Sequence, residues 1–538
     1  MKKVSGSMLI ILFLFFLASC SNDTNKSDQE NGEFSEDEDL YGGSLVVETK
    51  LEPKSFIYNY DWDGAIPYVN RNIFSKLAAF DEESKELYGD LAESWEESED
   101  LKEYTFHLRE DVEWHDGEPF TSEDVKWTIE DILDYGEGAN GYDSLSNVKK
   151  VETPDDSTVV IKLKEPSGVF VEKIADYTGF DILPEHIYED NDVDEVDPVG
   201  TGPFVFEEFE TGEHISLKAN EDYFGDGPFL DEVVFTFTPS ESTALNAIES
   251  GESGWMTASP AFAELDRLEN DEEISADLAT TDIVQWMGFN MDGSREEISD
   301  PKVREAISYA IDNDDISEKV YSGRLEPATS WYSTNVEWAD NKDVTIPDTD
   351  IEHANELLDD AGYSKDDEGK RFSLTFRTFE TSIFGTTDIP NIVRQQLDEI
   401  GIEVDVEQYE WAIRDEMLDE QRDWDIMSGG GDRGPDPLNF EEFLKSDTAT
   451  NKMQYDNEEV DNLFKKGEEK LEDEERAPYY HDIQKIMSKD IPIYNFVEYE
   501  DPSVYNNDYK GFFWQDEKDG NSAKHMINNV QWKGGEPK

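Results

Sequence analysis

The sequence has little positive charge, a single cysteine and only seven histidines. Against 45 lysine and arginine residues stand 130 aspartate and glutamate residues, which gives a formal net charge of −85 at pH 7. A surface this acidic repels phosphate backbones and anionic lipid head groups, so nucleic acid is excluded as a partner. One cysteine cannot form a disulfide within the chain, and no two histidines stand at the helical spacing of metal ligands. We therefore expect no metal site and no cofactor.

Long hydrophobic runs are also scarce. Lys2 and Lys3 precede an apolar run at residues 8–17, which has the length of a signal-peptide core and is short for a membrane span. The run ends in Leu-Ala-Ser-Cys at residues 17–20. This string is either a small-residue cleavage site that happens to contain cysteine or a bacterial lipobox, which it resembles. The only cysteine of the chain lies at this point, which favours the lipobox and acylation of Cys20.

The remainder of the chain is large and rich in residues that can be buried. Residues 21–40 are Ser, Asn, Asp, Glu and Lys with almost no apolar side chain, which predicts a flexible acidic tether. A chain of 538 residues is too long for a single hydrophobic core. Its content of 36% hydrophobic and 12% aromatic residues predicts two or three globular domains. The charge repulsion is tolerable where salt screens it, since the Debye length is about 3 Å near 1 M. We expect a high-salt habitat, and a melting temperature that rises with salt.

The stretch at residues 89–132 has the pattern strand, turn, helix. Residues 104–108 alternate between apolar and polar side chains, as in a strand with one buried face. Residues 116–119, Asp-Gly-Glu-Pro, form a turn. Thr121 with Asp124 predicts a capping box at the start of a helix. The apolar face of that helix is expected to contain Val125, Ile129 and Leu133.

The second half of the chain alternates helix and strand patterns. Asp300-Pro301 predicts a helix start, and Gly362 and Gly401 predict the ends of two further helices. Strand, helix, strand at this spacing implies a right-handed parallel unit and hence an α/β fold. The other expected elements are helices at 70–77, 351–358 and 392–400 and strands at 44–48, 158–164, 372–376, 402–406 and 425–427.

Several strings along the chain resemble the family 5 solute-binding proteins, the dipeptide, oligopeptide and nickel receptors of ABC importers. They are Gly-Asp-Leu-Ala-Glu-Ser-Trp from residue 89, Trp-His-Asp-Gly from 114, Gly-Thr-Gly-Pro-Phe from 200, Val-Arg-Glu-Ala from 303 and Gly-Ile-Glu-Val from 401. The resemblance covers nearly all of residues 43–500.

The resemblance implies a two-lobed periplasmic-binding-protein-like α/β fold of type II, with an extra N-terminal subdomain and a hinge-closing cleft. After a signal peptide at 1–20 and the tether at 21–40, the expected parts are lobe I at 41–67, 200–283 and 500–538, an inserted subdomain at 68–199 and lobe II at 284–499.

The best candidate for a binding site is the segment 424–440, in which a strand runs into a Gly-rich loop. By itself the segment also fits a flexible surface loop. The resemblance implies that an Asp in this loop pairs with the free α-ammonium of a peptide, because a desolvated ammonium needs a compensating carboxylate. Asp432 matches that position, between Gly431 and Arg433, and Asp436 is the alternative. Glycines at 429–431 would let a ligand backbone approach closely, although relatives often carry a Trp just before the Asp.

Three further residues match ligand-contacting positions of the family: Trp411, Tyr494 and Glu52. Trp411 fits an ordinary core position equally well. The sequence contains neither a Gly-x-Ser-x-Gly nor a His-Glu-x-x-His string, and we expect no enzyme.

The resemblance implies a monomeric lipoprotein on the outer face of the cytoplasmic membrane that captures di- or oligopeptides and delivers them to a permease driven by two ATPases. A receptor for a nickel chelate or an oligosaccharide, or a peptide sensor without import, would be the alternatives.

Overall fold

The computed structural model describes residues 41–512, apart from gaps at 61–65, 81–86, 137, 176–179, 190, 192, 194–195, 381–387, 411–412, 415, 435, 447 and 449, and also residues 531–532. In this part of the chain, no helix is both long and apolar enough to cross a membrane.

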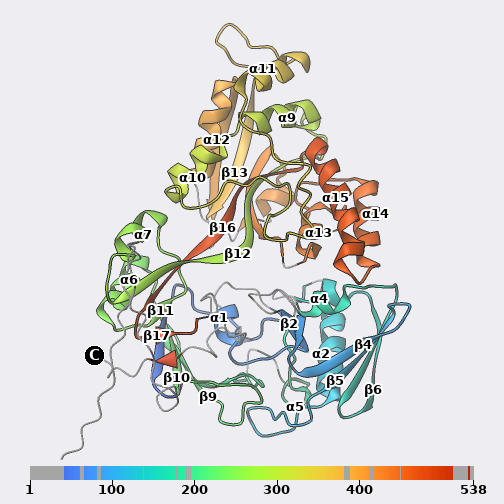
Figure 1. Ribbon diagram of the computed structural model, residues 1–538, viewed down its shortest axis with the longest axis vertical. Coiled ribbons are helices and arrows are strands. Elements are labelled where there is room, and N and C mark those ends of the chain that lie inside the picture. The colour runs from blue at the N-terminus through green and yellow to red at the C-terminus, as the bar shows by residue number, and fades with distance from the viewer. Residues whose placement is uncertain are drawn as a thin grey trace, which may run out of the picture. The chain divides into compact units, whose positions relative to one another are not determined.

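A mixed sheet of ten strands forms the framework of the described residues (Figure 1). In spatial order its strands are β14 (Ile402–Glu410), β13 (Phe372–Glu380), β15 (Ile426–Asp432), β12 (Ile274–Phe289), β16 (Ile493–Asn506), β11 (Trp255–Met256), β1 (Ser44–Thr49), β10 (Glu232–Phe237), β9 (His214–Ala219) and β8 (Phe204–Glu210). β12 and β16 are long antiparallel neighbours that connect the two halves of the sheet. Their register shifts between Thr280 and Val284, so the pair is irregular where it passes from one half to the other.

One half of the sheet contains β1 and β8–β11. The helices of this part are α1 (Ile66–Asn70), α6 (Glu241–Ser250) and α7 (Phe262–Leu268). The Gly-Thr-Gly-Pro-Phe turn lies against residues 72–73: the amide of Gly202 donates to Ile73 O at 2.8 Å, and a Cβ on Gly200 would lie 1.9 Å from the same oxygen. Only glycine permits this approach. The close contact also explains why the predicted helix at 70–77 is wrong, since the chain leaves α1 at Asn70 and turns along this loop.

A separate sheet of four antiparallel strands has the order β4 (Ala92–Glu97), β5 (Glu103–Leu108), β7 (Thr158–Leu163), β6 (Val148–Asp155). It packs with helix α2 (Ser122–Tyr135), and shorter helices accompany it: α3 (Tyr142–Leu145), α4 (Phe170–Ala175) and α5 (Glu185–Tyr188). The predicted strand at 104–108 and the capping box of Thr121 and Asp124 are confirmed. Val125 and Ile129 are fully buried as expected, Leu133 packs partly buried against the same core, and Ile132 is also fully buried. Two short strand pairs complete the sheets: β2 (Ala78–Phe80) with β3 (Leu87–Gly89), and β17 (Tyr509–Lys510) with β18 (Gln531–Trp532).

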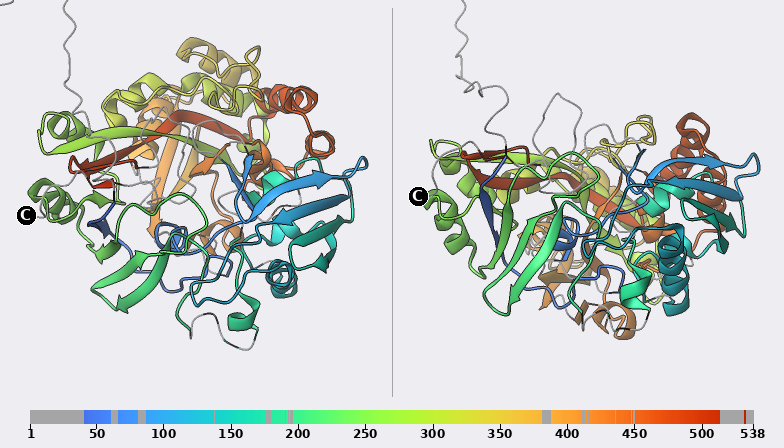
Figure 2. Two further views of the ribbon diagram at one scale, coloured as in Figure 1. Left: turned by 60° about the horizontal axis from the view of Figure 1, so that its bottom comes forward. Right: turned by 90° about the horizontal axis from the view of Figure 1, so that it is seen from below.

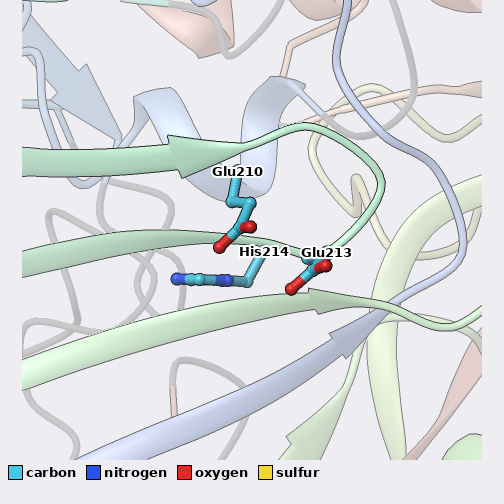
Figure 3. A group of neighbouring side chains, drawn as sticks. All are labelled: Glu210, Glu213 and His214. Carbon is cyan, nitrogen blue, oxygen red and sulfur yellow. The ribbon is translucent and has the colours of Figure 1, made fainter.

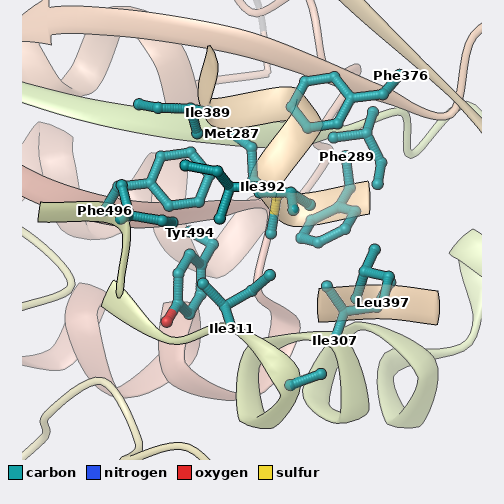
Figure 4. Packing of buried hydrophobic residues seen from close by; sticks show 14 of the residues in the cluster. Met287, Phe289, Ile307, Ile311, Phe376, Ile389, Ile392, Leu397, Tyr494 and Phe496 are labelled. Carbon is teal, nitrogen blue, oxygen red and sulfur yellow. The ribbon is translucent and has the colours of Figure 1, made fainter. Parts of the chain in front are cut away.

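The other half of the large sheet lies between two groups of helices. β13 and β14 are parallel and joined through α12 (Asp388–Glu399), which confirms the predicted parallel unit and the α/β class. One face packs against α12, α9 (Pro301–Ala310), α10 (Asn313–Tyr321) and α11 (Ile351–Asp360) in a core that includes Phe289, Ile307, Phe376 and Leu397 (Figure 4). The other face packs against α13 (Leu438–Leu444), α14 (Glu458–Glu468) and α15 (Asp473–Asp490). Helix α8 (Glu296–Ser299) and a π-helical turn at Glu416–Glu420 complete this part.

Helix α4, which accompanies the four-stranded sheet, lies beside α14, and two further views show the described elements from other sides (Figure 2). The amide of Gly168, just before α4, donates to Glu468 O at 2.7 Å. A Cβ on Gly168 would lie 2.0 Å from Lys470 O, so the two main chains touch directly.

Candidate functional site

The predicted binding segment contains a strand with one unpaired edge. β15 pairs with β12 along its whole length, from Ile426 to Asp432. Its pairing with β13 on the other side ends at Met427. Among the described residues no strand pairs with that side of 428–432, so these main-chain groups can receive a further strand. The sequence predicted the strand only to Met427 and a loop after it; the loop prediction is wrong for 428–432.

Gly429 and Gly431 lie beneath aromatic side chains. A Cβ on Gly429 would lie 2.4 Å from Cη2 of Trp286, and a Cβ on Gly431 would lie 3.0 Å from Cζ of Phe443. The rings of Trp286 and Phe443 are 5.5 Å apart and steeply inclined. The glycines therefore make room for aromatic packing inside the chain, and their predicted role in ligand approach stays a prediction.

Arg433 is fully buried directly after β15. Its guanidinium lies 4.8 Å from the ring centroid of Phe440 and 5.2 Å from that of Phe443, within the range of cation–π attraction. Its amide donates to Asp282 O at 2.7 Å, and its carbonyl accepts a hydrogen bond from the Tyr332 hydroxyl. Arg433 thus fixes the end of the strand by contacts within the chain.

A buried carboxylate lies close to this cation. Glu498 on β16 accepts hydrogen bonds from Ser333 Oγ and the Thr334 amide, both at 3.0 Å. Burial raises the pKa of Glu498, although these hydrogen bonds and the charge of Arg433 oppose the rise.

The two candidate aspartates differ in their surroundings. Asp432 is the last residue of β15 and pairs with Ile283 on β12, at the end of the unpaired edge; its side chain lies outside the described part. The carboxylate of Asp436 accepts two hydrogen bonds from Arg476, one of them 2.7 Å long from Nη2. Asp436 therefore already has a cationic partner within the chain.

Tyr494 and Glu52 are not brought together with this edge. Tyr494 is 1% exposed and packs in the core shown in Figure 4, with its ring 5.7 Å from that of Phe496. Glu52 follows β1 and accepts a hydrogen bond from the Gly212 amide at 3.2 Å. Trp411 and Cys20 lie outside the described residues.

One group of side chains in the described residues has metal-ligand geometry. Glu210, Glu213 and His214 lie on the β8–β9 hairpin, and their nearest ligand atoms are all within 4.8 Å of one another (Figure 3). Both glutamates are exposed, and such acidic groups are expected by chance on a chain with 130 acidic residues. No function is assigned to this group.

Comparison with known proteins establishes the family. Residues 86–452 match the family described as "Bacterial extracellular solute-binding proteins, family 5 Middle". The chain belongs to the family 5 solute-binding proteins. The oligopeptide-binding protein AppA of Bacillus subtilis is 31% identical over 523 residues, which cover 93% of this chain and 94% of AppA. The DppA protein of Helicobacter pylori, solved in complex with the peptide STSA, is 27% identical and has a TM-score of 0.78, with 92% of this chain and 99% of that chain covered.

Membership confirms the predicted fold class, a two-lobed binding protein of type II. It does not by itself choose the ligand, because the heme-binding protein A of Haemophilus influenzae is 26% identical over 526 residues, 91% of this chain and 93% of its own. The family is described by solute binding rather than by catalysis.

Sequence reasoning missed Trp286 as a neighbour of the candidate site. The available signal was a tryptophan within a mostly apolar segment at residues 283–289. Its position over Gly429 depends on pairing between strands that are about 140 residues apart, which no local pattern reveals.

Proposed function

We propose that this family 5 protein is a lipoprotein of an ABC importer that captures di- or oligopeptides between its lobes and delivers them to a membrane permease. The names of AppA and of the peptide complex of DppA support a peptide ligand. The observation that carries the proposal is the unpaired edge of β15 at residues 428–432. An extended peptide adds to such an edge through main-chain hydrogen bonds, which are independent of its sequence.

Asp432 would neutralise the α-ammonium of the bound peptide. It ends the unpaired edge, where the terminus of an added strand would lie. Asp436 is the weaker candidate because Arg476 already occupies its carboxylate, and a buried ion pair does not readily release one partner to a ligand.

The lobes would close about β12 and β16. The predicted division into lobe I (41–67, 200–283 and 500–538), inserted subdomain (68–199) and lobe II (284–499) places a boundary at 283/284. This boundary adjoins the register shift between Thr280 and Val284, and a few residues of irregular backbone are a usual place for hinge motion.

Replacement of Asp432 by Asn tests the peptide proposal. We expect the affinity for short peptides, measured by calorimetry, to fall at least tenfold, about 1.4 kcal/mol, because an ammonium would lose its charged partner. Asp405→Asn, an exposed position on β14, makes the same charge change away from the site and should leave affinity unchanged. Unchanged affinity in D432N would contradict the assigned role. A native protein that releases a metal chelate or a sugar on denaturation, in place of peptides, would contradict the peptide ligand.

Anchoring and habitat complete the proposal. Acylation of Cys20 would hold a monomer on the outer face of the cytoplasmic membrane; Cys20→Ser should release the protein into the medium. With a net charge of −85, raising salt from low to molar should markedly raise the melting temperature, and a flat response would contradict a high-salt habitat.

A further inference from the structure

The indole of Trp286 lies across the strand that carries the proposed peptide-binding edge. Trp286 pairs with Gly429, and residues directly opposite each other in an antiparallel pair point to the same face of the sheet. A Cβ on Gly429 would lie 2.4 Å from Cη2, 2.5 Å from Cζ2 and 2.7 Å from Cζ3 of Trp286. These atoms form the far end of the six-membered ring. The ring therefore leaves β12 and ends over Gly429, on the strand whose other edge has no strand partner at this point.

The indole also carries a donor that the described residues do not use. Trp286 is 2% exposed, and its Nε1 has no hydrogen-bond partner there. The neighbouring residue Gln285, 3% exposed, pairs with Gly430 and so points to the opposite face; its Nε2 is likewise without a partner. Buried donors without partners are rare in native structures. Two such donors, on opposite faces of the glycine run at 429–431, indicate that a bound ligand supplies the hydrogen-bond acceptors.

A peptide added to β15 would place one of its side chains against Trp286. Side chains alternate between the faces of a sheet, so the ligand residue beside Gly429 points to the face of the indole, and its neighbour points to the face of Gln285. On the indole face the surface is apolar, because the ring of Phe443 packs against that of Trp286. This surface accepts an apolar side chain.

We infer that Trp286 is a specificity-determining residue, which makes the protein prefer an apolar side chain at the one peptide position that lies beside Gly429. The inference rests on the proposed function. Gly429 is required for the same preference, since any side chain there would displace the ring of Trp286.

Peptide profiles of four proteins test this inference. Calorimetry on the full-length protein would use short synthetic peptides that carry Gly, Leu, Phe or Asp at each position in turn. In the wild type we expect one position at which Leu and Phe bind about tenfold more tightly than Asp. Trp286→Ala should abolish this preference at that position alone. Gly429→Ala should weaken it in the same way, and the double variant should show no further loss.

Trp424→Phe is the control for a purely structural effect. Trp424 is buried in the same core, but its Nε1 donates to Leu418 O at 3.2 Å. Its replacement should lower the melting temperature without changing the peptide profile. Trp286→Phe, which keeps one aromatic ring but loses the donor and the second ring, guards against misfolding of the alanine variant and should retain part of the preference.

The outcomes separate this inference from the proposed function. A wild type that binds none of the peptides would overturn the proposed function and this inference with it. A wild type that binds peptides, but whose profile is the same in W286A and G429A, would overturn the role of Trp286 and leave peptide capture intact.

Discussion

Two ion pairs of the described residues, one buried and one partly exposed, differ in what they join. Arg476 and Asp436 form an ion pair, and both lie in the predicted lobe II. Lys173 and Glu468 join α4, in the predicted inserted subdomain, to α14 in lobe II, at 3.1 Å and 295 residues apart in sequence. The first pair lies within one packed unit, and the second lies between two parts that the proposed opening would separate.

The pair within lobe II is enclosed. The Arg476 side chain is 1% exposed and that of Asp436 is 10% exposed. The guanidinium lies 5.0 Å from the ring centroid of Trp338 and 5.5 Å from that of Tyr480. Two parallel hydrogen bonds to a carboxylate form the strongest geometry available to arginine, and burial makes either charge costly without the other.

The pair between α4 and α14 is looser and shared. Its side chains are 25% and 18% exposed, and Glu468 also lies 3.9 Å from the ammonium of Lys445. Burial opposes the ionisation of Glu468, but the ammonium of Lys173 holds its pKa below the usual range; burial and the charge of Glu468 raise the pKa of Glu441. A contact of this kind would favour the proposed closure and could still separate into water, as a receptor that releases its ligand requires.

The largest effect is expected from breaking the enclosed pair. Arg476→Met leaves Asp436 buried without a cation, so the free energy of unfolding should fall by about 3–5 kcal/mol in denaturant titrations. Lys485→Met, which removes an exposed pair with Asp482, should cost about 1 kcal/mol or less. Equal losses in the two variants would contradict the contrast between enclosed and exposed pairs.

A smaller effect on stability but a clear one on binding is expected at Gly168. In Gly168→Ala the new methyl would lie 2.0 Å from Lys470 O, a backbone atom, so α4 and α14 cannot approach as they do here. We expect peptide affinity to fall about tenfold with little change in unfolding of lobe II, because closure is opposed rather than folding.

Gly138→Ala is the matched control, since its methyl would meet only the exposed ring of Tyr135, at 3.2 Å. Full peptide affinity in G168A would show that this contact does not contribute to closure.

Much of the fold followed from local patterns, whereas the site depended on long-range pairing. The capping box at Thr121, the helix start at Asp300 and the parallel strands around α12 are set by neighbours in sequence, and all were predicted. The strand through Gly429 was not, because glycine has no side chain to show a period of two and is unfavourable in strands. What makes it a strand is the register with β12 and the indole of Trp286, which come from a distant segment.

The smallest predicted effect concerns Glu172, which neighbours Lys173 on α4 and faces the enclosed pair. Burial raises its pKa to about 8, the charges of Asp436 and Asp473 add to the rise, and that of Arg476 opposes it. Tyr104 on β5 is a further titratable group near Glu172; burial, and after it the charge of Glu172, raises the pKa of the Tyr104 hydroxyl. A carboxyl whose pKa is higher in the native state than in the unfolded state stabilises the native state at a pH below 4.5, its usual pKa. This contribution is lost as the pH rises to about 8. The melting temperature should therefore decline between these values. In Glu172→Gln this part of the decline in melting temperature should disappear, because the amide does not titrate. The control Glu165→Gln, which changes an exposed glutamate, should show the same decline as the wild type. A pH profile identical in E172Q and the wild type would mean that Glu172 reaches water as easily as the looser pair of Lys173 and Glu468 beside it. The enclosed environment would then include the Arg476–Asp436 pair but not Glu172.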